Sequence, residues 1–120
     1  MITVSKVELS GFTNGTLLLT DVATLGEVIH AVTTVVTSTD EIWIWANNKH
    51  TADLAVTIEW GAAANEITQS IPFDAGAQLM VPGFIVPGAA GPVNITAFCA
   101  TASVISLYGF VNRISTVSAV

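Results

Sequence analysis

The stretch EIWIWANN at residues 41–48 is apolar on both sides of any strand that it forms. Successive side chains of a strand point to opposite faces. The two faces of this strand therefore carry Ile42, Ile44 and Ala46 on one side, and Trp43, Trp45 and Asn47 on the other. One face serves the core of a domain, and alternation alone does not say which. The other face also needs a cover, which is either a second sheet of the same chain or another polypeptide.

Segments with the composition of strands recur along the chain at intervals near ten residues, without a helical period. Turn signals such as Asn14-Gly15 separate them. Eight or nine short strands with this spacing are typical of an antiparallel β-sandwich, and we expect its jelly-roll form. A chain of 120 residues is long enough for one such domain. Residues 1–9 and 114–120 are interpreted as terminal arms of this single domain.

Two pairs of neighbouring segments are predicted to form hairpins because only short turns separate them. Residues 27–37, which are rich in β-branched side chains, are expected to turn at residues 38–40 into residues 41–48. Residues 93–100 are expected to turn in the same way into residues 103–113.

A third predicted hairpin joins residues 53–60 to residues 66–73 and sets Glu59 opposite Glu66. In the first of these strands, alternation predicts Leu54, Val56, Ile58 and Trp60 inward, and Asp53, Ala55, Thr57 and Glu59 outward.

Composition excludes several classes of partner. Hydrophobic residues make up 52% of the chain and charged residues 10%, so some apolar surface is expected to meet another protein. The net charge is −6, and the three basic residues, Lys6, Lys49 and Arg113, are scattered. Nucleic acid is not an expected partner because phosphate binding needs clustered cations. No apolar run approaches the roughly 18 residues of a membrane-spanning helix, so no membrane contact is expected.

No pattern of residues points to catalysis, a cofactor or a metal. His30 and His50 lie far apart in the sequence, without the short spacing of metal ligands. Cys99 alternates with apolar residues and is predicted to be a buried, unreactive thiol. Glu59 and Glu66 would face each other as glycosidase carboxylates do, but acidic residues near strand ends are usually solvated. We therefore do not expect an enzyme.

The tryptophans are the strongest remaining signal. Trp43 and Trp45 can belong to the core, anchor a subunit interface or form a platform for a sugar ring. Aromatic side chains of the last two strands lie opposite the faces of Cys99 and Leu107 and form a second apolar surface. The predicted interface residues are Trp43, Trp45, Phe98, Tyr108 and Phe110.

Four segments in series, EIWIWANN, AVTIEWG, IPFDAGAQLMVPGFIV and VNITAFCATASVISLYGFVNRI, resemble small β-sandwich proteins of tailed bacteriophage particles. The resemblance covers residues 27–114 and carries no catalytic residues. It implies a structural component of the virion, above all a decoration (cement) protein on the outside of the capsid. Such a protein would be made in the bacterial host cytoplasm, which fits a single reduced cysteine.

The expected partners are other copies of the chain, with a trimer favoured, and the major capsid protein or other virion proteins. Two alternatives stay open. The first is a tail, neck or fibre-attachment protein of the virion. The second is a carbohydrate-binding module used in host adsorption, which would explain the tryptophans.

Overall fold

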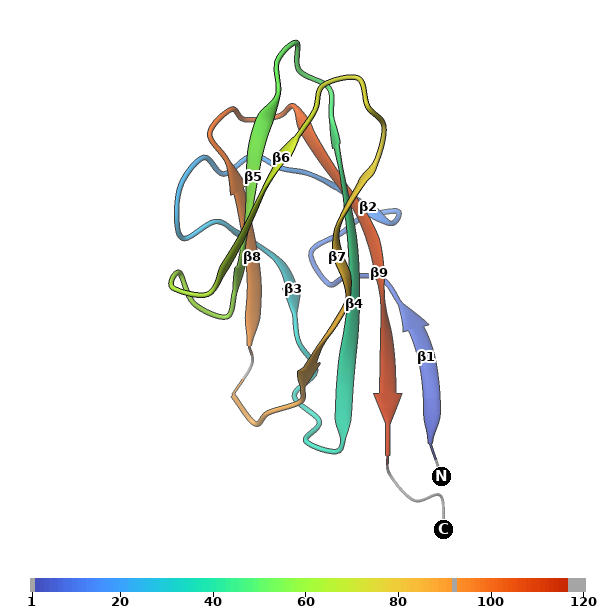
Figure 1. The fold of residues 1–120 in the computed structure, drawn as a ribbon. Coiled ribbons are helices and arrows are strands. Elements are labelled where there is room, and N and C mark those ends of the chain that lie inside the picture. Colours follow the sequence, from blue (N-terminus) through green and yellow to red (C-terminus); the bar gives the residue numbers. More distant parts are fainter. Residues whose placement is uncertain (1, 92, 117–120) are drawn as a thin grey trace.

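The computed structural model describes residues 2–91 and 93–116, which form nine strands in two antiparallel sheets (Figure 1). Sheet A contains, in order, β1 (Thr3–Val7), β9 (Ile105–Ser115), β4 (Ser38–Asn48) and β7 (Gln78–Pro87), and β2 (Thr16–Leu18) also pairs with β9. Sheet B contains, in order, β3 (Glu27–Ala31), β8 (Asn94–Cys99), β5 (Leu54–Trp60) and β6 (Glu66–Ile71). The predicted all-β sandwich is confirmed. In the described part of the chain, no helix is long and apolar enough to cross a membrane.

The strand pairings follow the plan of one long hairpin whose tip is the turn at residues 61–65. Next to the tip β5 pairs with β6, and then β4 pairs with β7, β3 with β8, and β2 with β9. These nested pairs fall alternately into sheet B and sheet A, so the long hairpin is wound around the core. Successive windings also pair with each other, β8 with β5 and β9 with β4. The sandwich is therefore closed by segments that are far apart in the sequence.

Two of the three predicted hairpins are wrong. Residues 27–37 and 41–48 do not pair, because β3 belongs to sheet B and β4 to sheet A. The predicted turn at residues 38–40 is the start of β4. Residues 93–100 and 103–113 are separated in the same way, since β8 lies in sheet B and β9 in sheet A. A short connection can join two strands of one sheet or cross between sheets, and here the crossing lets both strands bury an apolar face.

The hairpin of β5 and β6 is confirmed, and its register places Glu59 opposite Glu66. The tight turn predicted at Asn14-Gly15 is also present: both residues have positive φ, and Thr13 pairs with Thr16 across them. Positive φ at both central positions is the requirement of a type I′ hairpin turn, which Asn-Gly meets with little strain.

The core lies between the two sheets and decides which face of β4 is internal. Ile42, Ile44 and Ala46 have no exposed surface, whereas Trp43 and Trp45 are half-buried. Side chains from the other strands and from the segment between β1 and β2 fill the same interior, among them Leu9, Ile29, Val56, Ile58, Ile95, Cys99, Leu107 and Val111. The thiol of Cys99 is free and buried, as predicted.

Both terminal segments take part in sheet A where the structure describes them. β1 pairs with β9 from Thr3 opposite Ser115 to Val7 opposite Val111, and Leu9 is fully buried. Residues 117–120 of the C-terminal segment lie outside the described residues.

Candidate functional site

Four of the five predicted interface residues come together on the outer face of sheet A. The pairing of β4 with β9 places Trp43 opposite Phe110 and Trp45 opposite Tyr108. All four side chains point away from the core, since Ile42, Ile44 and Ala46 of β4 and Leu107 and Val111 of β9 alternate with them and are buried. The structure separates the fifth residue, Phe98, which lies opposite Thr57 on the outer face of sheet B.

Three of these four side chains, Trp43, Trp45 and Phe110, form a stack of aromatic rings. The ring of Trp43 lies 6.1 Å from that of Trp45 and 6.1 Å from that of Phe110, with interplanar angles of 19° and 17°. The ammonium group of Lys6, on β1, lies 4.5 Å from the centroid of the Phe110 ring. On the side of β7, Gly83 approaches Trp43 so closely that an added Cβ would lie 2.7 Å from the indole ring.

These contacts hold Trp43, Trp45 and Phe110 together as one group on the outer face of sheet A. Large aromatic side chains gathered in this way are typical of the centres of protein interfaces.

A short polar row crosses the same face beside the aromatic stack. The registers of β1 with β9 and of β4 with β9 place Lys6, Asn112 and Glu41 side by side on three neighbouring strands. Glu41 accepts hydrogen bonds from Trp43 Nε1 at 2.8 Å and from Asn112 Nδ2 at 3.0 Å. These two bonds lower the pKa of Glu41, so its carboxylate is held in the charged form.

Aliphatic side chains lie around the aromatic stack on the outer side of sheet A. Leu79 pairs with Trp45 and Ile85 pairs with Glu41. Farther along the strands, Val4 pairs with the half-buried Ile114, and Leu18 pairs with Ser106. Val4 is 61% and Ile85 is 62% exposed. We call this whole surface, the stack with its polar row and aliphatic surround, the aromatic face. Contiguous apolar surfaces of this kind on a folded domain commonly mark contacts with other proteins.

A buried polar cluster ties the two sheets together at His30, Asp40 and Arg113. His30 on β3 is 1% exposed and Asp40 on β4 is fully buried. The carboxylate of Asp40 accepts two hydrogen bonds from the Arg113 guanidinium, at 2.8 and 3.0 Å, and one from the Thr33 amide at 3.0 Å. His30 Nε2 lies 2.8 Å from the same carboxylate.

The hydrogen bonds of His30 define its neutral form. Its Nδ1 accepts from the backbone N–H of Ser10 at 3.1 Å, so Nδ1 carries no proton and Nε2 donates to Asp40. Burial lowers the pKa of His30, and this effect outweighs the bond to Asp40. Burial by itself would raise the pKa of Asp40, but hydrogen bonds from Arg113 and His30 and from the Thr33 amide lower it overall. The cluster therefore holds a neutral imidazole against an ionised carboxylate.

Ser10, His30 and Asp40 have the residue types of a catalytic serine-histidine-aspartate triad, but they do not have its hydrogen bonds. A catalytic serine needs its hydroxyl bonded to the imidazole. The hydroxyl of Ser10 instead accepts the Ala31 amide at 2.7 Å, and the imidazole is occupied by the Ser10 backbone. The arrangement joins the segment before β2 to both sheets and acts as a structural tie.

Glu59 was predicted to point outward into solvent. The outward direction is correct, but the side chain is not exposed. It lies on the outer side of sheet B and is fully buried there by the loop that precedes β3. Its carboxylate accepts hydrogen bonds from Thr24 Oγ1, from the Gly26 amide at 2.9 Å and from Thr96 Oγ1 at 3.1 Å. Burial by itself would raise the pKa of Glu59, but these bonds lower it overall. Its partner across the hairpin, Glu66, is exposed, so the two carboxylates lie in different environments.

No metal-binding group emerges in residues 2–91 and 93–116, where no three His, Cys, Asp or Glu side chains come together. A hollow of about 450 Å³ does open between β6 and β7, the edge strands of the two sheets. Its lining residues are Trp60, Ala64, Asn65, Glu66, Ile67 and Phe84.

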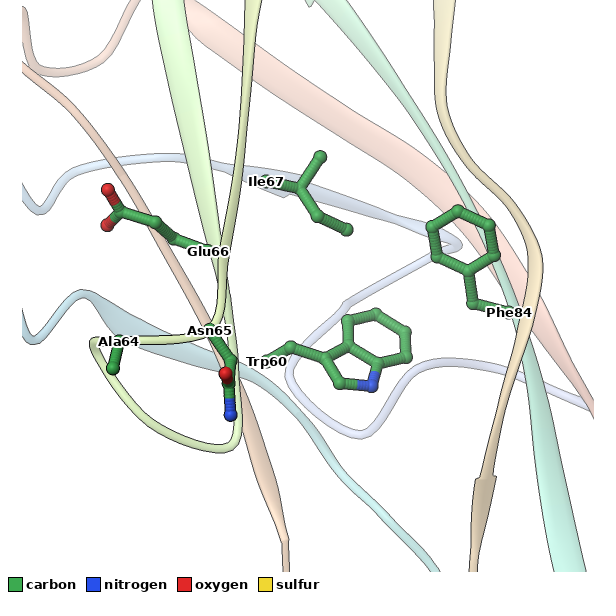
Figure 2. A pocket seen from close by; sticks show the side chains of 6 residues that line it. All are labelled: Trp60, Ala64, Asn65, Glu66, Ile67 and Phe84. Atoms are coloured by element: carbon green, nitrogen blue, oxygen red, sulfur yellow. The ribbon is translucent and has the colours of Figure 1, made fainter.

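Sequence reasoning missed this hollow. Figure 2 shows Ile67, Trp60 and Phe84 pointing toward one another, while the carboxylate of Glu66 points away from them. The rings of Trp60 and Phe84 are 6.0 Å apart and nearly perpendicular, at 79°. Phe84 lies next to an irregularity in the pairing of β7 with β4, where alternation does not predict the direction of a side chain.

The fold and the site together define a β-sandwich with an exposed aromatic sheet face. No protein-family model, curated protein or solved structure matches this chain. The geometry of the aromatic face is therefore the basis for assigning a function.

Proposed function

We propose that this chain is a non-enzymatic structural protein of a bacteriophage virion, a capsid decoration (cement) protein that binds its neighbours through the aromatic face. The partners in this proposal are the major capsid protein and other copies of the chain. Its place is the outer surface of the capsid, after synthesis in the cytoplasm of the bacterial host.

The observation that carries the proposal is the aromatic stack of Trp43, Trp45 and Phe110 on an outward sheet face. Large aromatic side chains dominate the energy of protein interfaces, especially near their centres. The stack is already ordered by its neighbours and by the bond from Trp43 to Glu41, so binding would cost little further side-chain entropy. A preorganised apolar face without an adjacent reactive group suits adhesion.

The fold supports the same proposal. We infer that the sandwich is a jelly roll, because its nested pairs form one long hairpin wound into two sheets. Jelly rolls are common in viral capsid proteins and in lectins. The edge strand β7 contains Pro82 and Pro87, which hinder unwanted addition of further strands. Contacts would then be directed to the sheet face.

The mechanism of a cement protein is mass action. A protein that binds the assembled lattice and not the free capsid subunits stabilises the lattice by about 2.7 kcal/mol per site at a concentration 100 times the Kd. The acidic remainder of the surface, in a chain of net charge −6, would keep the decorated particle soluble and repel DNA.

Quantitative mass spectrometry of purified virions from the phage that encodes this chain tests the proposal. A capsid decoration protein is expected at a copy number comparable with that of the major capsid protein. A far lower copy number would favour a tail, neck or fibre-attachment protein instead. Absence from purified particles would overturn both virion assignments.

Binding of the purified chain to undecorated capsids tests the surface. Trp45→Ala is expected to weaken binding strongly, because it removes one ring of the stack. Phe98→Ala is the matched control, since it truncates an aromatic side chain on the other sheet. Equal loss of binding in both variants would contradict the assignment to the aromatic face.

Carbohydrate binding is a second candidate function, and the hollow between β6 and β7 favours it. The perpendicular rings of Trp60 and Phe84 leave aromatic surface open, and Phe84 is 44% exposed. Asn65 supplies an amide at the rim, and sites for small ligands combine such apolar walls with a few polar groups. A glycan array tests it: binding that Trp60→Ala abolishes and Trp45→Ala leaves intact would support a sugar site here.

A further inference from the structure

We infer that two copies of this chain pair through their aromatic faces about a two-fold axis along β9, so that Lys6 of each copy meets Glu41 of the other. This inference rests on the proposed function in one respect, that the aromatic face is a contact surface. For the protein free in solution, it adds the identity of the occupant, which is a second copy, and the register in which the two copies meet.

The distribution of charge favours a second copy at this face. Two molecules that each carry a net charge of −6 repel each other over most of their surfaces. The outer side of the strands of the aromatic face carries one cation, Lys6, and one anion, Glu41, so the face itself has no excess charge. The two other charged residues of these strands, Asp40 and Arg113, are paired with each other on the inner side. Glu8 follows β1 at the rim and accepts a hydrogen bond from the Gly15 amide. The other exposed or half-buried acidic side chains lie outside these strands: Asp21, Glu27, Asp53, Glu66 and Asp74.

The register fixes where the two charges lie relative to β9. Lys6 is paired with Asn112, and Asn112 is paired with Glu41 on the opposite side. Neighbouring strands are about 4.8 Å apart, so Lys6 and Glu41 lie at about equal distances on the two sides of β9. When a second copy is turned over onto this face about an axis along β9, its β1 lies on β4 and its β4 lies on β1. Each Lys6 then meets Glu41 of the partner subunit.

This contact is self-complementary, as a two-fold interface must be. It forms two equivalent ion pairs, one on each side of the axis. The side chains on the axis, Asn112, Phe110 and Tyr108, meet their own counterparts, and Trp43 and Trp45 flank them. The surrounding apolar groups exclude water from the ion pairs, so these pairs count for more than exposed ones.

A three-fold ring, the oligomer expected from the sequence, would use two different surfaces of each copy. It would not bring Lys6 and Glu41 together reciprocally. The positions of the two charges therefore favour a closed dimer as the unit of self-association.

Charge reversal at these two positions tests the pairing in solution. In a homodimer of Lys6→Glu, both contacts between positions 6 and 41 bring two acidic side chains together. In a homodimer of Glu41→Lys, both contacts bring two cations together. Each variant alone is expected to raise the Kd of the dimer by at least about 100-fold, because opposed like charges are strongly unfavourable at an interface. An equimolar mixture of the two variants is expected to form heterodimers, since every opposed pair is then of opposite sign. Analytical ultracentrifugation measures all three states.

Three further variants make the test decisive. Lys49→Glu changes the net charge by as much as Lys6→Glu at an exposed site outside the face, and it is expected to keep the dimer. Glu41→Gln keeps an oxygen that accepts from Trp43 and Asn112, so it removes the charge with little disturbance of the stack and should weaken the dimer moderately. The double variant with both reversals is expected to dimerise again. Circular dichroism confirms that each variant is folded.

A parent protein that stays monomeric at high micromolar concentration would overturn the inference. A dimer that neither single reversal weakens, or one that the mixture fails to restore, would overturn this register. Neither result decides whether the chain belongs to a virion, because the copy number in purified particles is measured independently.

Discussion

Asp40 shows how one buried carboxylate organises its surroundings at the scale of single residues. It joins β4 to β9 through Arg113 and to β3 through His30, so it links the two sheets of the sandwich. A charge in this position is stabilised only while all its partners remain in place. The protonation of His30 would place a proton on Nδ1, opposite the N–H of Ser10, and remove that hydrogen bond.

We predict that the free energy of unfolding decreases as the pH falls below about 6.5. The pKa of His30 is lowered from its ordinary value of 6.5 in the folded protein, so the unfolded chain binds a proton that the folded one does not. Asp40 adds a further decrease below its ordinary value of 3.8, because its pKa is lowered too. Urea unfolding at about pH 7.5 and about pH 5.5 measures the first effect.

His30→Gln is expected to be less stable than the parent at neutral pH and to lose most of the decrease between these two pH values. His50→Gln is the matched control, because His50 lies outside the buried cluster, and it should keep the pH dependence of the parent. A parent whose stability is the same at both pH values would contradict the assignment of a neutral His30.

The acidic residues also mark where sequence reasoning fails at this scale. Alternation correctly put Glu59 and Ile58 on opposite faces of β5, but it left open which face of β4 belongs to the core, and the structure buries Ile44. It did not foresee that Glu59 is buried, because the cover comes from a loop more than thirty residues earlier in the chain, at Thr24 and Gly26. The alternation of a strand predicts which face of the sheet a side chain lies on, but it does not predict whether another segment covers that face.

At the scale of elements, the pairing of β4 with β9 depends on the absence of a side chain at Gly109. A Cβ at this position would lie 2.0 Å from the carbonyl oxygen of Trp43 in the neighbouring strand. We predict that Gly109→Ala lowers the free energy of unfolding by about 3 kcal/mol or more, because the obstacle is backbone and cannot rotate away. Gly91→Ala is the control, since a Cβ there meets nothing within 4 Å. Chemical denaturation compares the two, and equal stabilities would contradict the close approach.

The two faces of β4 are predicted to have separate tasks. Ile44→Ala leaves a cavity in the core and should cost about 3–4 kcal/mol of stability. Trp45→Ala removes a half-buried ring from the aromatic face and should cost only about 1–2 kcal/mol. Self-association should follow the opposite order: we expect it to be lost in Trp45→Ala and retained by the folded fraction of Ile44→Ala. Denaturation and light scattering on the same samples check both halves of this prediction.

Strand identity was predictable from the sequence, but strand pairing was predictable only for the hairpin of β5 and β6. The segments at 41–48, 54–60, 66–71 and 94–99 are strands where alternation and turn residues predicted them. The partner of each strand is decided by which apolar faces bury one another, and this information is spread over the whole chain. For the site, the pattern of β4 and β9 brought out Trp43, Trp45, Tyr108 and Phe110, but the role of Lys6 depends on β1 lying beside β9.

At the scale of the whole molecule, the arrangement of the strands in two sheets explains why the chain has an apolar sheet face that its own core does not cover. Two sheets enclose a single core, and each sheet has one face turned away from it. Sheet B covers part of its outer face with the loop before β3, which buries Glu59. The outer face of sheet A keeps exposed side chains such as Val4 and Ile85 around its aromatic stack. Association through the aromatic face would bury the apolar side chains that the folded monomer leaves exposed there.

If two copies cover each other's aromatic face, the thermal stability of the protein must depend on its concentration. Unfolding of a dimer releases two chains, so each tenfold rise in concentration adds about 1.4 kcal/mol per dimer. For a chain of this size we expect the Tm to rise by about 2–3 °C per tenfold increase. Differential scanning fluorimetry over two decades of concentration measures the slope. Lys49→Glu should keep this slope and Lys6→Glu should flatten it, because only the second variant alters the contact. A Tm of the parent protein that is constant over this range would mean that the aromatic face is open in the free molecule and is covered by a different partner.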